Sequence, residues 1–397
     1  KANVELNNLT TFCLVLYDDY TISGEGLVLT SPWPVRWYGG NGTAMDWSGI
    51  TFTAENPSIV LLSLWNGTLS LPPSQMTGGY KFWFSDTTLE SGDTLILEDG
   101  VELSNRGTHR LTIEGTLQAS YTQAVDVFKS SAAVFDVFVQ NGGALLLENA
   151  NVNLAVSSSK FRVQEGGTLE MTGGFVDVAD SLRVYTGGAA ELAGVSLQSA
   201  VSVEGGSLSL ENCAFDNTAL NVGAGSTLSL CNTSGISTLT IDGSATITAI
   251  TGNDFSATAL NLTNFAENQT IDLSGNEWGT DDINEIFAML GAAANKVTID
   301  GQTGIASNYF VVSNTNNSGA GSLRDAIAQA NAYTGEEIPQ IRFAASLAGQ
   351  TIQLSSALPA ISADCVIDGR GVRLSSYALT CSGDVELNDI TLPQLVV

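Results

Sequence analysis

Residues 161–194 read FRVQEGGTLEMTGGFVDVADSLRVYTGGAAELAG, and this stretch contains two copies of one short pattern. Each copy opens with apolar residues two positions apart, Phe161 and Val163 in the first copy and Leu182 and Val184 in the second. Such alternation is typical of a β-strand with one buried face. A glycine pair and a second alternating strand follow. The stretch therefore predicts short strands that are separated by tight turns.

The same pattern recurs throughout residues 137–247. The last glycines of its turns, at positions 143, 167, 188, 206, 225 and 243, follow one another at intervals of 24, 21, 18, 19 and 18 residues. Glycine or asparagine also follows the second strand of each copy, as Asn149, Gly173, Gly194, Asn212 and Asn232. Both residue types tolerate positive φ, so we expect a left-handed bend at each of these positions. A third strand then supplies Val152, Val176, Leu197 and Phe215.

Three strands and two bends in about 20 residues cannot enclose a hydrophobic core, but stacked copies can bury their inward side chains in columns. The pattern thus predicts an all-β fold, a right-handed parallel β-helix with short capping helices. A leucine-rich repeat would need its asparagine inside a different leucine frame. Helical repeats would need a period of 3.6, which is absent here.

The chain divides into three predicted regions. Residues 1–80 form irregular, strand-rich and aromatic N-terminal rungs or a cap. Residues 81–305 form the β-helix, with a capping helix at about 281–290, and residues 306–397 begin a second β-helix with a helix at about 322–331.

Both predicted helices have recognisable starts. Ile283, Ile286, Phe287 and Leu290 have helical spacing, and we expect this helix to cover the end of the first β-helix as a lid, with Asn284 facing outward. Asp281 and Asp282 suit its first turn, where acidic side chains offset unpaired amides. Ser322 and Asp325 have the spacing of a capping box.

Composition limits the partners. Lys and Arg total 14 against 41 Asp and Glu, for a net charge of −27, so nucleic acid and anionic membrane surfaces are repelled. No transmembrane run or signal peptide is evident, and we expect no direct membrane insertion. The chain begins at Lys1 without methionine and ends in apolar sequence, which suggests a piece of a longer polypeptide. The cysteines show no C-x-x-C pair, and free thiols are the favoured interpretation, although Cys365 and Cys381 could lie on adjacent rungs.

No catalytic, cofactor-binding or metal-binding residues are predicted. His109, the single histidine, falls in a turn, and Arg162, Arg183, Glu148, Glu170, Glu191 and Glu211 form an outward, solvated row that could at most bind Ca²⁺ weakly. The candidate ligand contacts are Trp33, Trp37, Trp47, Trp65 and Trp83. If exposed, these rings could stack on sugars; if buried, they would close the end of the solenoid, and burial is the favoured alternative.

A resemblance to a known family enters at residues 310–327, which read FVVSNTNNSGAGSLRDAI. With LAGQTIQL at 347–354, LPAI at 358–361 and IDG at 367–369, this segment resembles the opening of β-helix modules in very large bacterial surface and secreted proteins. GNEWGT at 275–280 is similar to the closing segment of such modules and of polymorphic outer-membrane adhesins. Many relatives carry cysteine where this chain has Gly321.

The resemblance implies a structural or adhesive segment that is exported to the cell surface or the extracellular space. We therefore predict a non-enzymatic, elongated spacer or adhesin, with carbohydrate or a host or neighbouring cell surface as its partner. The alternative is a carbohydrate-binding protein or a polysaccharide lyase or glycoside hydrolase, since the same fold carries these enzymes. The sequence lacks the groups such enzymes use, because His109 has no Gly-His-Gly context and no Arg-x-Lys is present.

Overall fold

A computed structural model describes residues 86–397, except residues 98, 100, 106, 107, 131, 132 and 157, together with the backbone of seven earlier strands. The side chains of residues 87, 104 and 105 also lie outside the description. The earlier strands are β1 (Phe12–Val15), β2 (Leu27–Thr30), β3 (Val35–Tyr38), β4 (Ile50–Thr53), β5 (Ser58–Leu61), β6 (Thr68–Leu71) and β7 (Lys81–Phe84).

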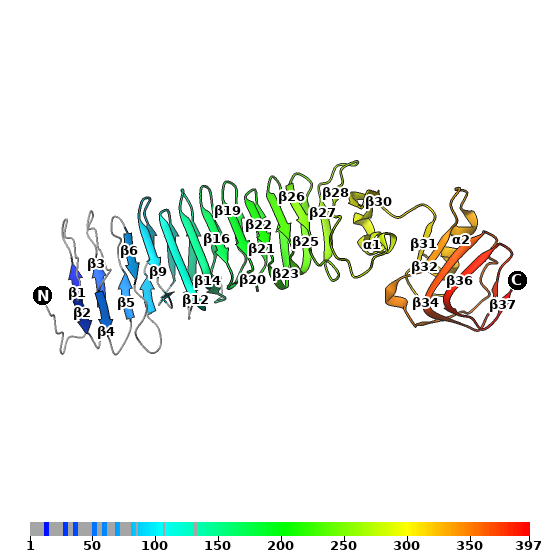
Figure 1. The fold of residues 1–397 in the computed structure, drawn as a ribbon, viewed down its shortest axis with the longest axis horizontal. Helices are drawn as coiled ribbons and strands as arrows, with labels where there is room; N and C mark the ends of the chain where they lie inside the picture. The colour runs from blue at the N-terminus through cyan, green and yellow to red at the C-terminus, as the bar shows by residue number, and fades with distance from the viewer. Residues whose placement is uncertain are drawn as a thin grey trace. The chain divides into compact units, whose positions relative to one another are not determined.

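The predicted fold class is confirmed. Strands hold 51% of the residues and form a right-handed parallel β-solenoid of about 14 turns, with only two short α-helices. Contacts divide the chain into two compact units, Lys1–Gly279 and Thr280–Val397. Within the first unit, successive coils lie side by side from β1 to β27 (Figure 1).

Three parallel faces run along the first unit. The first face contains β8 (Thr87–Leu89), β11 (His109–Ile113), β13 (Phe135–Val139), β15 (Phe161–Val163), β18 (Leu182–Tyr185), β21 (Val201–Glu204), the ends of β23 (Ala214–Val222) and β25 (Ser234–Asp242), and β27 (Ala259–Thr263). The second contains β6, β9 (Thr94–Leu97), the starts of β12 (Thr116–Lys129) and β14 (Ala144–Leu154), β16 (Thr168–Thr172), β19 (Ala189–Ala193), β22 (Ser207–Glu211), β24 (Thr227–Cys231) and β26 (Thr246–Thr251).

The third face contains β1, β3, β5, β7, β10 (Glu102–Asn105), the ends of β12 and β14, β17 (Phe175–Val178), β20 (Ser196–Leu197) and the start of β23. β2 pairs with β4, and the short strand β28 (Ile271–Asp272) comes late in the unit.

Register explains the repeat. Val137, Phe161, Leu182, Val201 and Leu220 pair in sequence from coil to coil and are completely buried. Equivalent columns of leucine and valine fill the other faces, so the inward positions found by alternation are the core. The predicted left-handed bends are also confirmed, because all five bend positions have positive φ: Asn149, Gly173, Gly194, Asn212 and Asn232.

The second unit begins with α1 (Ile283–Leu290), the 3₁₀ turn η1 (Gly291–Lys296) and the antiparallel pair β29 (Val297–Ile299) and β30 (Gln302–Thr303). Its parallel strands are β31 (Tyr309–Val312), β32 (Gln340–Phe343), β33 (Thr351–Gln353), β34 (Cys365–Ser375), β35 (Leu379–Thr380), β36 (Val385–Thr391) and β37 (Leu395–Val396). α2 (Leu323–Ala332) and the short turn η2 (Ala345–Leu347) lie between strands.

The two helices begin as the sequence predicts. Asp282 caps α1 and accepts hydrogen bonds from the amides of Asn284 and Glu285. Ser322 caps α2 by accepting from the Asp325 amide, and Leu323, Ile327 and their buried neighbours join the core of the second unit. The expected placement of α1 as a lid on the first β-helix concerns the relative position of the two units and stays a prediction.

Candidate functional site

Two polar clusters stand out in the described part of the chain. One lies on the first face of the solenoid around His109, and the other surrounds α1 in the second unit. Their chemistry differs, because the first lines an open cavity, whereas the second is filled by its own hydrogen bonds.

The cavity around His109 has a volume of about 420 Å³ and is lined by Asp86, Thr88, Thr108, His109, Arg110, Thr112 and Asp136. Three successive coils supply these residues. In the register of β8, β11 and β13, Thr88 pairs with Thr112 and Arg110 pairs with Asp136. Polar residues of neighbouring coils therefore meet at one place on the surface.

The sequence pattern placed His109 in a turn, and this prediction was wrong. His109 is the first residue of β11. Its Nδ1 lies 3.7 Å from Oδ1 of Asp86, and its side chain is 29% exposed. The strand begins here because the His109 amide donates to the Val134 carbonyl of the next coil. Hydrogen bonding between the two coils therefore starts earlier than the alternation of apolar residues suggests. The histidine thus forms part of a cavity wall.

Arg110 connects the cavity to the strand below it. Its amide donates to Oδ1 of Asp86 at 2.9 Å, and its guanidinium carbon lies 4.3 Å from the centroid of the Phe138 ring. Nη2 lies 3.8 Å from Oδ2 of Asp136, which is beyond hydrogen-bond distance. Asp136 is buried, and its Oδ1 accepts from the Lys160 amide. The guanidinium is therefore held by its flat face rather than by a saturated ion pair.

Further along the same face, Arg162 and Arg183 form a charged ladder. Arg162, expected to be solvated, is only 5% exposed and pairs with Asp180, while its Nη1 donates to the Ser181 carbonyl at 2.8 Å. The next coil covers this outward position, which single-strand alternation does not reveal. Arg183 contacts Asp180 and Glu204, both at 3.1 Å.

Burial alone would raise the pKa of Asp180. The hydrogen bond and charge of Arg162, together with the charge of Arg183, outweigh this and hold the pKa of Asp180 below its usual range. Asp180 is therefore ionised at neutral pH and serves both arginines. The predicted glutamates at positions 148, 170, 191 and 211 are exposed, in agreement with a solvated face.

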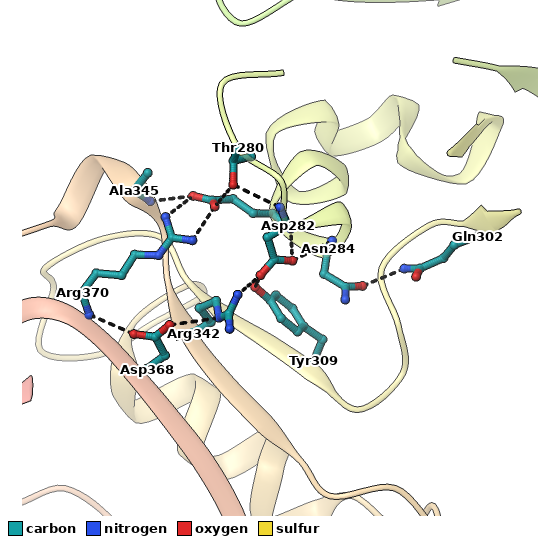
Figure 2. A network of polar contacts seen from close by, with 10 residues as sticks. Thr280, Asp282, Asn284, Gln302, Tyr309, Arg342, Ala345, Asp368 and Arg370 are labelled. Atoms are coloured by element: carbon teal, nitrogen blue, oxygen red, sulfur yellow. Dashed lines mark hydrogen bonds and ion pairs between the residues drawn. The ribbon is translucent and has the colours of Figure 1, made fainter. Parts of the chain in front are cut away.

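The second cluster holds α1 against strands of its own unit (Figure 2). Asp282, the helix cap, also accepts from the Tyr309 hydroxyl at 2.9 Å and pairs with Arg342. Arg342 in turn lies 3.4 Å from a carboxylate oxygen of Asp368. Burial, followed by the charge of Asp282, raises the pKa of Tyr309 and keeps the hydroxyl protonated.

Glu285 makes the most complete set of contacts in this cluster. Its side chain is 5% exposed and accepts two hydrogen bonds from Arg370, at 2.9 and 2.6 Å. The Ala345 amide and the Thr280 hydroxyl donate to it as well, each at 2.8 Å. Both oxygens of this carboxylate accept two hydrogen bonds, so Glu285 joins α1 to the rest of its unit.

Asn284 also belongs to the cluster and is not the free, outward residue that helical spacing indicated. Its Oδ1 accepts from Nε2 of Gln302 and from the Ala306 amide, each at 2.7 Å. Met289, with 55% of its surface exposed, is the outward side of α1. Helical spacing alone missed this contact, because η1 and β30 return the chain to the polar face of the helix.

The tryptophan side chains predicted to contact ligand, those of Trp33, Trp37, Trp47, Trp65 and Trp83, lie outside the described residues, and their role stays a prediction. In the described part, no three His, Cys, Asp or Glu side chains are grouped so that they could hold a metal ion. Cys213, Cys231, Cys365 and Cys381 are free thiols. No described helix is long and apolar enough to span a bilayer.

The two clusters differ in how far the sequence could indicate them. Asp86 and Asp136 lie about one coil before and after Arg110, so coil spacing was an available signal for the cavity. The arginine partners of Glu285 and Asp282 lie 85 and 60 residues away, and no repeat links them. Comparison with known proteins adds no further guide: no protein family, curated protein or solved structure matches the chain.

Proposed function

We propose that the chain is a non-enzymatic, elongated segment of a large bacterial cell-surface or secreted protein, acting as a spacer or adhesin-type support outside the cell. The observation that carries this proposal is the in-register stack of the first unit. Each coil pairs with the coil before it and the coil after it, from β8 through β27. Each coil adds about 4.8 Å to the stack, so length is set by coil number.

Polar side chains of the first unit reinforce the stack. Gln140 donates to Glu114 at 2.9 Å, Arg183 to Glu204 at 3.1 Å, and Asn264 to Asp242 at 2.6 Å. In each pair the two residues come from neighbouring coils, 18 or more residues apart in sequence. These carboxylates thus stiffen the solenoid, which suits a support better than acid–base chemistry. The resemblance of residues 310–369 to modules of bacterial surface proteins supports the location.

A coil deletion tests the spacer role. Ala189 pairs with Ser207, so removing residues 189–206 joins Gly188 to Ser207 and puts β22 in the place of β19. Thr116 and Thr246 lie on one column, six coil steps apart. Spin labels at these two positions should move closer by about 4.8 Å in the deletion variant, with cooperative unfolding retained.

An unfolded deletion variant, or an unchanged distance, would show that the coils are not interchangeable spacer units.

The non-enzymatic part of the proposal has its own test. Purified protein is incubated with acidic and neutral polysaccharides, with and without calcium, and we expect no cleavage. Turnover that disappears when an acidic residue is replaced would overturn it.

A further inference from the structure

The cavity around His109 combines an opening to solvent with acidic, basic and hydroxyl side chains. Its volume, about 420 Å³, falls in the range of small-molecule sites, roughly 300–1,000 Å³. Two carboxylates, a guanidinium, an imidazole and threonine hydroxyls line it, so its wall offers both donors and acceptors. A ligand that matches this wall must itself offer both donors and acceptors.

Charge narrows the ligand further. Among the described residues that line the cavity there are two carboxylates and one guanidinium, and the whole chain carries a net charge of −27, so phosphate, sulfate and uronate groups are disfavoured. A bare metal ion would be repelled by the guanidinium of Arg110. Among the described residues, no three His, Cys, Asp or Glu side chains are grouped so that they could hold one. A neutral ligand with many hydroxyl groups remains, since each hydroxyl both donates and accepts.

The geometry of Arg110 supports such a ligand. The guanidinium lies on the Phe138 ring, and among the described residues its charged neighbour is Asp136, too distant for a hydrogen bond. Its planar N–H groups are thus pre-positioned but not used up. Asp136 is buried, and the Lys160 amide donates to its Oδ1, while its Oδ2 faces Nη2 of Arg110 at 3.8 Å.

We infer that this cavity binds a neutral oligosaccharide, with Arg110 and Asp136 contacting vicinal hydroxyls and Thr88 and Thr112 extending the contact along the strands. Neighbouring coils place equivalent residues about 4.8 Å apart, so the wall repeats on the scale of a sugar chain rather than a single small ion. This inference goes beyond a spacer role, which requires no ligand.

Saturation-transfer NMR on the intact chain tests the inference. The probes are neutral gluco-, manno- and galacto-oligosaccharides, with an oligogalacturonate as the charged comparison. We expect transfer to at least one neutral series and none to the oligogalacturonate. Arg110→Ala and Asp136→Asn should each weaken binding about tenfold or more, because each removes a charged hydrogen-bond partner.

Thr112→Val provides the matched comparison, because it removes one hydroxyl with little change of shape. Thr240→Val is its control: Thr240 is outward and half-buried on the same face, yet several coils from the cavity. Weaker binding in Thr112→Val with unchanged binding in Thr240→Val supports the site. Equal binding by all variants, no transfer from any neutral probe, or a preference for the oligogalacturonate would each overturn it, and none of these results bears on the coil-deletion test.

Discussion

Successive coils of the first unit meet through columns of apolar side chains, whereas α1 in the second unit meets its strands through ion pairs. Phe161 and Leu182 illustrate the first arrangement, and Glu285 with Arg370 the second. The apolar columns tolerate exchange among leucine, valine and phenylalanine, since burial is non-directional. The ion pairs need specific partners and geometry. A repeated junction can thus be generic, while the junction of a single helix must be specific.

The largest expected effect comes from the apolar columns. Phe161→Ala removes a completely buried ring and should lower the free energy of unfolding by about 3–5 kcal/mol. Phe343→Ala, equally buried in the second unit, is the counterpart. Scanning calorimetry should show each variant lowering the transition of its own unit. If either variant lowers both transitions alike, the units unfold as one and the comparison loses its basis.

The ion pairs of α1 come next. Glu285→Gln leaves Arg370 without its charged partner in a nearly buried site and should cost about 3 kcal/mol in the second unit. Glu337→Gln is the control, because Glu337 is exposed in the same unit. Urea unfolding followed by circular dichroism measures both. Similar midpoints for the two variants would mean that the cluster contributes no more than surface charge does.

A smaller effect is expected at the bends of the solenoid. Asn212→Val forces a β-branched residue to a φ of 52° and should cost about 1–2 kcal/mol. The same cost is expected for Gly194→Val. Gly194→Asn should be milder, because asparagine tolerates positive φ better than a β-branched residue does. Thermal unfolding of the three variants checks this order. Stability in Asn212→Val equal to that of the parent protein would contradict the left-handed bend.

The smallest expected effect is the pH dependence of the stability that the ion pairs of Asp180 with Arg162 and Arg183 contribute. Because the pKa of Asp180 is lowered on folding, its contribution is complete above the unfolded value of about 3.9 and is lost as pH falls through the folded value. The difference in stability between the parent protein and Asp180→Asn should therefore be constant near pH 7 and should shrink as pH falls below the unfolded value. Denaturant titrations over this pH range test this, and a difference that does not change with pH would assign the effect to packing.

Much of the fold is predictable from the sequence, because each coil repeats the same alternation of apolar residues and the same bends. Alternation identifies inward residues such as Phe161, and asparagine or glycine at one offset identifies the bends, as at Asn212. Contacts that depend on the neighbouring coil are harder to predict. Arg162 occupies an outward position by alternation, yet Asp180 and Ser181 of the following segment enclose it.

Candidate sites were less predictable than the fold for the same reason. The cavity residues Asp86, Arg110 and Asp136 come from three coils, and Arg370, the charged partner of Glu285, lies on a strand that no local pattern connects to α1. Secondary structure is encoded within a few residues, as the Ser322 cap of α2 shows. A side-chain cluster also depends on register, which local pattern does not contain.

The nearest-neighbour pairing of coils in the first unit has a mechanical consequence. Hydrogen bonds between parallel coils point along the stacking direction, so a pull on the ends of this unit loads them one coil at a time. Each detached coil of 18 to 24 residues would release roughly 60–80 Å of extended chain. Under tension the solenoid would lengthen in steps and dissipate mechanical energy as each coil detaches. The coils that are still attached would keep their register.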